Sequence, residues 1–99
     1  MECAESDGIL VVSLVGRIDS ANASEFSNEL LAIAESRPEL PMELDATELE
    51  YVSSAGLRAF RHAYMEMRQK HGVLAAKNVG RSVMEVLEIT GFTRLFKFI

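Results

Sequence analysis

The chain has 99 residues, of which 48% are hydrophobic and 25% are charged, a balance typical of one globular domain with its own core. Acidic residues outnumber basic ones 15 to 10, and the net charge of −5 argues against binding to a nucleic-acid backbone, which requires clustered Lys and Arg. No apolar run approaches the roughly 20 residues that span a bilayer. We therefore expect a single soluble domain over residues 1–99, without a targeting segment and without a membrane partner.

Residue types that bind metals or act as nucleophiles are few and scattered. Cys3 is the only cysteine, which excludes an internal disulfide and fits a cytoplasmic protein. We expect its side chain to act as a small apolar residue in or beside the first strand. His62 and His71 are nine positions apart and remote from Cys3, so the spacing of a metal-binding motif is absent. Neither histidine is expected beside Ser54, which argues against a catalytic serine. There is no glycine-rich phosphate loop. We expect no metal site, no cofactor and no catalytic activity.

The N-terminal segment is predicted to form two strands joined by a tight turn. Residues 1–8 are typical of an edge strand that ends in the turn signal Ser6-Asp7-Gly8, which favours a hairpin. The nearly continuous apolar run from Ile9 to Val15 predicts a strand buried on much of both faces, and Gly16 is expected to end it.

A helix is predicted from about Asn22 to Ser36, with Asp19, Ser20 or Asn22 as its cap. Its apolar residues recur every three or four positions and form one stripe: Ala23, Phe26, Leu30, Ile33 and Ala34. Prolines 38 and 41 mark a loop. A third strand is expected to begin at Met42 and to fade by Thr47, with Leu49 and Tyr51 anchoring the following connection to the body of the domain.

A second helix is predicted from Ser54 to about Lys70, closed by Gly72, with an apolar face made by Leu57, Phe60, Tyr64 and Met67. A short strand over residues 73–76 and a third helix from Arg81 to Thr90, ended by Gly91, follow. The last segment, with Leu95, Phe96 and Phe98, is expected to be a strand or a docking tail. Alternating strands and helices predict an α/β domain with a mixed, mostly parallel sheet of four to five strands, with helices packed against it.

The stretch from Asp45 to Arg58 carries the functional signal. Two serines, Ser53 and Ser54, stand where a connection enters the second predicted helix. The first backbone N–H groups of a helix lack partners, and the helix dipole places positive charge there. A serine at such a position acts as a helix cap or, when phosphorylated, presents an anion that suits those donors. The spacing leaves both interpretations open.

The run Tyr-Val-Ser-Ser-Ala-Gly-Leu-Arg at 51–58 resembles the signature of anti-sigma factor antagonists, which belong to the STAS domain family. The Gly-Arg-Ile-Asp run at 16–19 and the Ile-Thr-Gly-Phe run at 89–92 are also similar to that family. Aligning Gly56 and Leu57 on the signature implies that Ser54 is the phosphorylated serine. Many members have an aspartate just before this serine, whereas here the residue is Ser53, which stands as the alternative site.

The resemblance implies a non-enzymatic protein, a monomer or weak dimer, whose unmodified form binds an anti-sigma factor and so releases a sigma factor. That anti-sigma factor is a serine kinase in the family, and a phosphatase reverses the modification. An alternative is a STAS regulatory domain that is not phosphorylated and binds a small ligand or acts in a larger sensory or transport assembly. The expected partner-binding residues are Asp19, Ser53, Ser54, Gly56, Leu57, Arg58 and Arg61.

Two of these residues also have simpler explanations. In the family, an aspartate in the context of Asp19 lies close to the modified serine, and the parallel sheet places both at the same rim. The carboxylate of Asp19 serves equally well as an ordinary helix cap. Arg58 is one helical turn from Ser54 and within reach of a phosphate, although such an arginine is often simply solvated.

Overall fold

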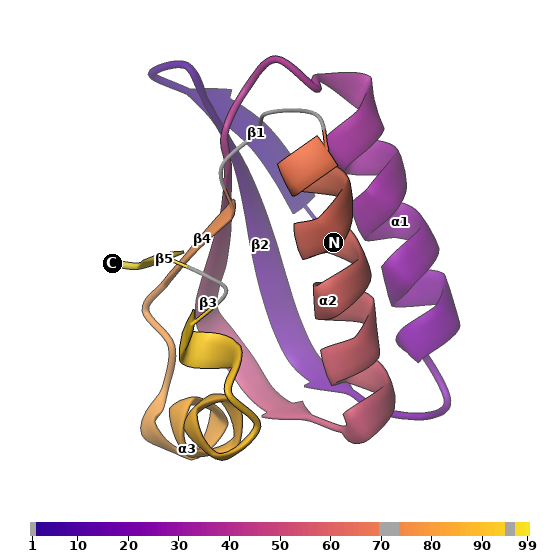
Figure 1. Cartoon of the computed structure of the whole chain (residues 1–99), viewed down its shortest axis with the longest axis vertical. Coiled ribbons are helices and arrows are strands. Elements are labelled where there is room, and N and C mark those ends of the chain that lie inside the picture. Colours follow the sequence, from indigo (N-terminus) through magenta and orange to yellow (C-terminus); the bar gives the residue numbers. More distant parts are fainter. Residues whose placement is uncertain (1, 70–73, 95–96) are drawn as a thin grey trace.

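A computed structural model of the chain describes residues 2–69, 74–94 and 97–99. Five strands form one sheet in the order β1-β2-β3-β4-β5, and three helices and one short 3₁₀ helix accompany it. The pair β1–β2 is antiparallel and the other pairs are parallel. In Figure 1, α1 and α2 lie side by side along the sheet, and α3 lies at the end where β3 runs into α2. The mixed, mostly parallel α/β sheet predicted from the sequence is confirmed.

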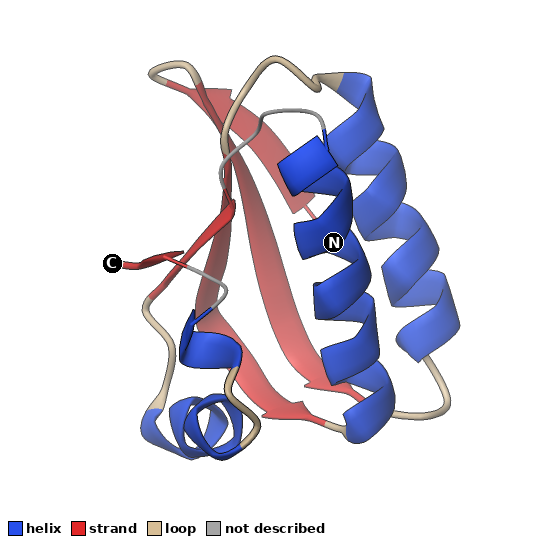
Figure 2. Cartoon of the chain, in the orientation of Figure 1, coloured by secondary structure: helices blue, strands red, loops and turns tan. Residues whose placement is uncertain are grey.

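After the β1–β2 hairpin, strands and helices alternate along the chain; Figure 2 distinguishes the two kinds of element by colour. Their bounds are β1 Glu2–Ser6, β2 Ile9–Ile18, α1 Ala23–Ser36, β3 Met42–Val52, α2 Ser54–Gln69, β4 Leu74–Lys77, α3 Arg81–Ile89, the 3₁₀ helix Phe92–Arg94 and β5 Lys97–Phe98. The predicted helices and their starting residues are confirmed, and the last apolar segment includes a short strand. The predicted C-terminal residues of the second helix, Lys70 and Gly72, and the apolar pair Leu95 and Phe96 lie outside the described residues.

The hairpin has the turn that its sequence predicts. Asp7 and Gly8 both have positive φ, 52° and 75°, as the central residues of a tight hairpin turn require. The edge strand that precedes them is exposed along its whole length. Cys3 lies in this strand, as predicted, but it is exposed rather than buried as a small apolar residue, because every residue of this edge strand is exposed.

The second strand is longer than predicted and is buried on one face. Gly16 does not end β2 but lies inside it with φ +79°, and the strand continues to Ile18. Leu10, Val12 and Leu14 are buried in the core, whereas Val15 is 65% exposed. The prediction of burial on both faces is therefore wrong, because the helices that pack on the sheet bury only one face of β2.

The third strand also runs further than its sequence pattern indicates. It is 11 residues long, and its pairing with β2 shifts register twice, between Ser13 and Val15 and between Gly16 and Arg17. At each shift β3 contains one residue more than β2 opposite it, which is the geometry of a β-bulge. The bulges give buried positions at every third residue, Ala46, Leu49 and Val52, in place of simple alternation. For this reason the expected loop after Thr47 is strand, and only Ser53 separates β3 from α2.

Asp45 holds the first bulge in place. Its Oδ1 atom accepts hydrogen bonds from the Thr47 hydroxyl at 2.6 Å, from the Thr47 amide at 3.1 Å and from the Asn78 side chain at 3.3 Å. The Thr47 hydroxyl is the largest cause of a pKa for Asp45 below the ordinary aspartate value. These bonds tie Asp45 to Thr47 and to Asn78 where the register first shifts, so they stabilise the path of the strand toward the helix that follows.

A single core joins the sheet to the helices. Leu30, Met42, Leu44 and Val12 have the largest fully buried side chains, and the rings of Phe26 in α1 and Phe60 in α2 meet edge to face at a centroid distance of 5.4 Å. Aromatic pairs prefer this arrangement over face-to-face stacking. Within the described residues, none of the helices is both long enough and apolar enough to cross a membrane.

Candidate functional site

The candidate site is built where β2 and β3 end side by side. The backbone N–H of Ser53, the residue after β3, donates to the carbonyl oxygen of Ile18, the last residue of β2, at 2.8 Å. Asp19 follows Ile18, and Ser54 follows Ser53. Asp19 and the serine pair therefore leave the sheet at the same rim, as expected for neighbouring parallel strands.

The two serines have different environments. The Ser53 Oγ atom accepts a hydrogen bond from the Gly56 amide at 3.2 Å, and the Ser53 carbonyl oxygen accepts one from the Leu57 amide at 2.9 Å. These are the bonds of a helix N-cap. Ser54 is the first helical residue, is exposed, and its hydroxyl has no partner among the residues that the structure describes. One hydroxyl of the pair is thus engaged and half-buried, and the other is accessible.

Gly56 and Leu57 attach the start of α2 to the core. A Cβ atom on Gly56 would lie 2.8 Å from Ile18 Cγ2, 2.8 Å from Val52 Cγ1 and 3.2 Å from the Ile18 carbonyl oxygen. Only glycine allows the helix to approach the strand ends so closely. The Leu57 side chain is 8% exposed and belongs to the core. Leu57, an expected partner-contact residue, therefore has its side chain largely inside the domain.

The loop after β2 is held by Asn22 rather than by a conventional cap. Asn22 occupies the N-cap position of α1, but its side chain makes no capping hydrogen bond. Its Oδ1 atom instead accepts from the Asp19 amide at 2.9 Å, and its Nδ2 atom donates to the Arg17 carbonyl at 2.8 Å. The Asp19 Oδ1 atom accepts from the Ala21 amide at 3.0 Å. These bonds keep the half-buried Asp19 at the rim of the sheet.

Positive charge gathers on the exposed surface of α2. Arg58 and Arg61 supply this charge, since both are exposed, and the first turn of the helix has no acidic residue. Arg58 and His62 border a groove of about 210 Å³ between α1 and α2, whose other residues are small: Ala23, Ser24, Ser27, Ala55 and Ala59. Together with the helix dipole, Arg58 and Arg61 make the surroundings of Ser54 attractive to anions in an otherwise acidic protein.

Two neighbouring residues, Arg17 and Tyr51, extend this rim onto the sheet. They are paired across β2 and β3, and the Arg17 guanidinium carbon lies 4.3 Å from the centroid of the Tyr51 ring. This distance fits a cation–π contact. Tyr51 is 40% exposed, so the prediction that it anchors a loop onto the core is wrong, whereas Leu49 is buried as expected. No signal in the sequence reveals the pair, because it depends on the shifted register.

The fold and the strand–helix junction are those of a STAS domain. The family model described as "Mlab, STAS domain" matches residues 1–97, and the chain belongs to this family. Its relatives include a Bordetella bronchiseptica protein assigned as the anti-sigma factor antagonist BtrV. The two are 39% identical over 90 residues, which cover 91% of this chain and 77% of that protein.

Solved structures of similar proteins show the same fold. A STAS domain protein of Planctomyces limnophilus, described as an anti-sigma-factor antagonist, has a TM-score of 0.88 at 16% identity, covering 99% of this chain and 86% of that one. The Bacillus cell fate determinant SpoIIAA in its phosphorylated form has a TM-score of 0.72 at 13% identity, covering 99% of this chain and 89% of that one. The chain is therefore a member of the anti-sigma factor antagonist group of STAS domains.

Proposed function

We propose that this chain is a cytoplasmic, non-enzymatic anti-sigma factor antagonist that is switched by phosphorylation of Ser54. The unmodified form binds an anti-sigma factor that is a serine kinase, and a sigma factor is released. The kinase then phosphorylates Ser54 and the complex separates, and a phosphatase restores the unmodified form. The relative named as an anti-sigma factor antagonist and the existence of SpoIIAA in a phosphorylated form support this proposal.

The observation that carries the proposal is the difference between the two serines. A kinase needs a free hydroxyl that it can reach, and Ser54 is exposed and unpartnered among the described residues. The Ser53 hydroxyl accepts a hydrogen bond from the Gly56 amide, so presenting this hydroxyl to a kinase as the phosphoryl acceptor would break the helix cap. We therefore assign the modification to Ser54 rather than to Ser53.

A phosphate on Ser54 is compatible with the folded domain. It carries about −1.5 to −2 charges at neutral pH. At the N-terminus of α2 the helix dipole favours an exposed negative charge by roughly 0.3–1 kcal/mol. Arg58, one helical turn further on, offers a guanidinium with which the phosphate can pair. The modified domain therefore remains folded.

The same phosphate opposes binding of the partner. The contact surface that we propose consists of Asp19, Ser53, Ser54, Arg58 and Arg61, with Gly56 and Leu57 positioning the helix from inside. A dianion at the centre of this surface must be desolvated when the partner binds, and a mispaired buried charge costs about 2–5 kcal/mol. Pairing of the phosphate with Arg58 also withdraws a cation from the partner. Both effects act in the same direction.

The test is to incubate the wild-type protein, Ser54→Ala and Ser53→Ala with ATP, with and without a candidate anti-sigma kinase from the same genome, and to map phosphate by mass spectrometry. We expect one phosphate on the wild type and on Ser53→Ala, none on Ser54→Ala, and none with ATP alone. Phosphate on Ser53 only would overturn the site assignment.

The alternative, an unphosphorylated regulatory domain that binds a small ligand, predicts a different set of results. In that case no kinase modifies the chain, and Ser54→Asp leaves partner binding unchanged. Phosphate incorporated from ATP alone would contradict both functions, because it would require catalysis by the chain itself.

A further inference from the structure

Arg17 and Tyr51 lie at the end of the sheet, on the face away from α1 and α2. The next residue of each strand, Ile18 or Val52, is buried where the start of α2 meets the sheet. Because successive side chains of a strand point to opposite faces, Arg17 and Tyr51 point away from the two helices. Both are exposed. They therefore form a surface pair one residue from the bond between Ser53 and Ile18, at the rim that carries the proposed switch.

The backbone at this point is adapted to present the pair. Gly16 has φ +79°, a conformation that residues with a side chain rarely adopt, although a Cβ atom there would meet nothing within 4 Å. The path of the backbone, and not a lack of space, therefore favours glycine. Next to it, the partner of β2 changes from Leu49 to Tyr51 and Glu50 is skipped. Bulges of this kind often re-aim a side chain beside a functional site.

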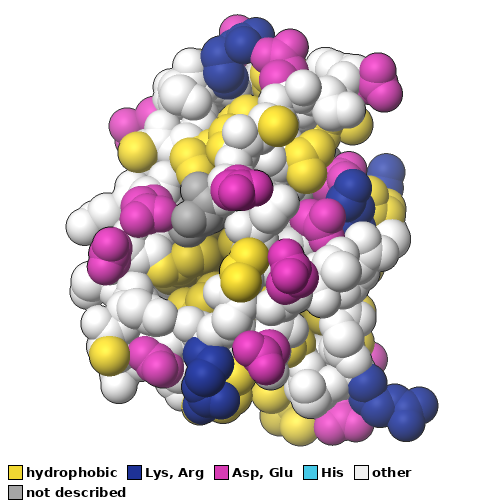
Figure 3. Space-filling view, turned by 180° about the vertical axis from the view of Figure 1, so that it is seen from behind, with side chains coloured by type: hydrophobic (Ala, Val, Ile, Leu, Met, Phe, Trp, Pro, Cys, Tyr) yellow, Lys and Arg dark blue, Asp and Glu magenta, His cyan; other side chains and the backbone are white. Residues whose placement is uncertain are grey.

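The charge around the pair is mostly negative. Seen from behind, the molecule carries Asp and Glu side chains over much of its surface, whereas Lys and Arg gather in a few separate places (Figure 3). Glu48 and Glu50 are exposed in the same part of β3. A polyanion such as a nucleic acid would be repelled by many of these charges, while a single side chain needs to approach only Arg17. The surroundings therefore favour a protein partner over a polyanion.

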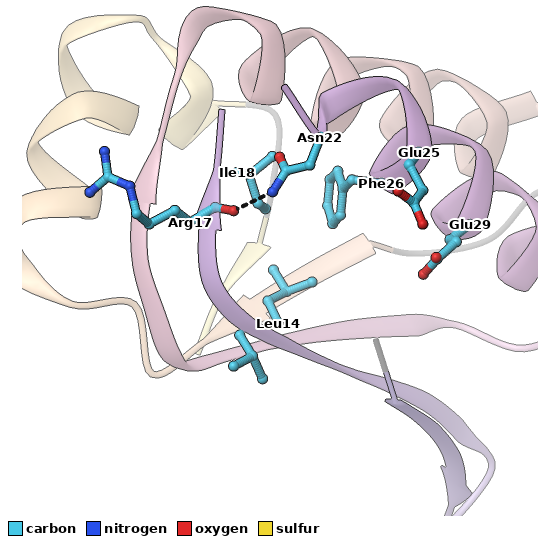
Figure 4. Close-up of a pocket in the computed structure, with 8 residues that line it drawn as sticks. Leu14, Arg17, Ile18, Asn22, Glu25, Phe26 and Glu29 are labelled. Atoms are coloured by element: carbon cyan, nitrogen blue, oxygen red, sulfur yellow. Dashed lines mark hydrogen bonds between the residues drawn. The ribbon is translucent and has the colours of Figure 1, made fainter. Parts of the chain in front are cut away.

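The Arg17 guanidinium is restrained but keeps its hydrogen-bond donors free. Its contact with the Tyr51 ring, at 4.3 Å from the centroid, holds the side chain without giving its N–H groups a conventional acceptor. Arginine has five N–H donors, and within residues 2–69, 74–94 and 97–99 the Arg17 side chain makes no hydrogen bond or ion pair. Arg37, by contrast, pairs with Glu5 and Glu39. In Figure 4 the Arg17 guanidinium points away from the other labelled side chains.

This combination matches a carboxylate with an apolar neighbour. The fork of N–H donors in a guanidinium fits the two oxygens of a carboxylate, and a guanidinium that is already restrained loses less freedom on binding. The Tyr51 ring and the Val15 side chain, 40% and 65% exposed, supply apolar area beside it. Arg and Tyr are also among the residues that contribute most to binding at protein interfaces.

We propose that Arg17 and Tyr51 form a second part of the partner-binding surface, to which the anti-sigma factor binds through an acidic side chain. This inference rests on the proposed function and names the chemistry of its partner at residues that the switch does not use. An Asp or Glu of the anti-sigma factor accepts two hydrogen bonds from the Arg17 guanidinium, and an apolar residue beside it covers the Tyr51 ring. A partner that binds at Ser54 reaches the pair across the rim.

The test is calorimetric titration of a candidate anti-sigma kinase from the same genome, with ADP present, into the wild-type chain and its variants. Arg17→Gln should weaken binding about 10- to 100-fold, as expected for loss of charge-assisted hydrogen bonds. Arg17→Lys keeps the charge but lacks the fork, so it should still lose about threefold or more. Tyr51→Ala should be about 3- to 30-fold weaker. Tyr51→Phe, which keeps the ring, should bind within about twofold of the wild type.

Lys97→Gln is the matched control, because it removes one exposed positive charge elsewhere on the sheet. Lys97 is aligned through β4 and β3 with Val11, far along β2 from Arg17. This variant should bind within about twofold of the wild type, and all variants should keep a Tm close to that of the wild type. In phosphorylation assays, Arg17→Gln should raise the KM of the kinase for the chain about fivefold or more with little change in kcat, since Arg17 binds the kinase without touching the transferred phosphate.

Double-mutant cycles identify the acidic group. Each exposed Asp and Glu of the kinase is replaced in turn by Asn or Gln and combined with Arg17→Gln. We expect one carboxylate to show a coupling of about fivefold or more in Kd. The absence of any such coupling, or equal effects of Arg17→Gln and Lys97→Gln, would overturn the proposal.

The same titrations separate this proposal from the phosphorylation switch. If the kinase binds the wild type but does not modify Ser54, the switch is wrong, and a weaker Kd for Arg17→Gln still supports the proposal. If Ser54 is modified and Arg17→Gln binds like the wild type, the proposal is wrong and the switch stands. If no anti-sigma kinase of the genome binds the wild-type chain, both are wrong.

Discussion

Replacement of Gly56 tests how the start of α2 is positioned. In a solvent-exposed helix, Gly→Ala stabilises by roughly 0.5–1 kcal/mol through helix propensity. Here the added methyl group would meet Ile18 Cγ2 and Val52 Cγ1, each at 2.8 Å. Both neighbours are buried and β-branched, so their side chains cannot easily turn away. Overpacking of this kind costs about 1–3 kcal/mol. We therefore expect a net loss for Gly56→Ala of about 0.5–2 kcal/mol, and a larger loss for Gly56→Val.

The assay is chemical and thermal unfolding followed by circular dichroism. For a domain of this size, 1 kcal/mol corresponds to a shift in Tm of roughly 4–8 °C. Val52→Ala, which removes one of the two opposing methyl groups, should reduce the cost of Gly56→Ala, giving a coupling of about 0.5 kcal/mol or more in a double-mutant cycle. An exposed change on the same helix, Arg61→Ala, should remain within about 0.5 kcal/mol of the wild type. If Gly56→Ala raises the free energy of unfolding as propensity alone predicts, the steric argument is wrong.

Three further changes test the neighbouring contacts. Ser53→Ala should lower the free energy of unfolding by about 0.5–2 kcal/mol through loss of the cap, whereas Ser54→Ala should leave it nearly unchanged; equal losses in denaturant titrations would argue against the assignment of Ser53 as the cap. Asp19→Asn should lower the rate of phosphorylation more than it lowers Tm, and an unaltered rate with a reduced Tm would restrict Asp19 to a structural role. The pKa of Asp45 is lower in the folded chain than its ordinary value, so its contribution to stability is present above the unfolded-state pKa and is lost as the pH falls through the folded-state value. Unfolding titrations should therefore show stability decreasing on acidification below about pH 4, with a smaller slope for Asp45→Asn, and identical slopes would contradict this.

The sequence predicted those elements whose apolar spacing is regular. The helices α1, α2 and α3 each have an apolar stripe with a period near 3.6, and their starts were predicted correctly. The strand β3 was predicted too short because its two bulges replace alternation by a spacing of three. A local pattern does not show a bulge, since the extra residue is defined only by the strand opposite. The prediction for Tyr51 failed for the same reason.

Prediction of the site depended on how far its contacts are separated in sequence. The parallel order of β2 and β3 was enough to predict that Asp19 and the serine pair share one rim. Spacing did not predict which of the two adjacent serines caps α2, because serine is a good N-cap at either position. The structure identifies Ser53 as the cap, since its Oγ atom accepts the hydrogen bond from the Gly56 amide. The cation–π pair of Arg17 and Tyr51 requires the register of the sheet, which no local pattern contains.

The affinity of the unmodified and the Ser54-phosphorylated protein for the anti-sigma kinase, measured by calorimetry under identical conditions, tests the proposed switch most directly. We expect phosphorylation to weaken binding by about 30-fold to several thousand-fold, corresponding to roughly 2–5 kcal/mol. Circular dichroism and Tm should remain those of the folded domain. Ser54→Ala should bind like the unmodified protein in the presence of ATP, and Ser54→Asp, with less charge, should be weakened only in part. Equal affinities of the unmodified and phosphorylated forms would contradict the phosphorylation switch.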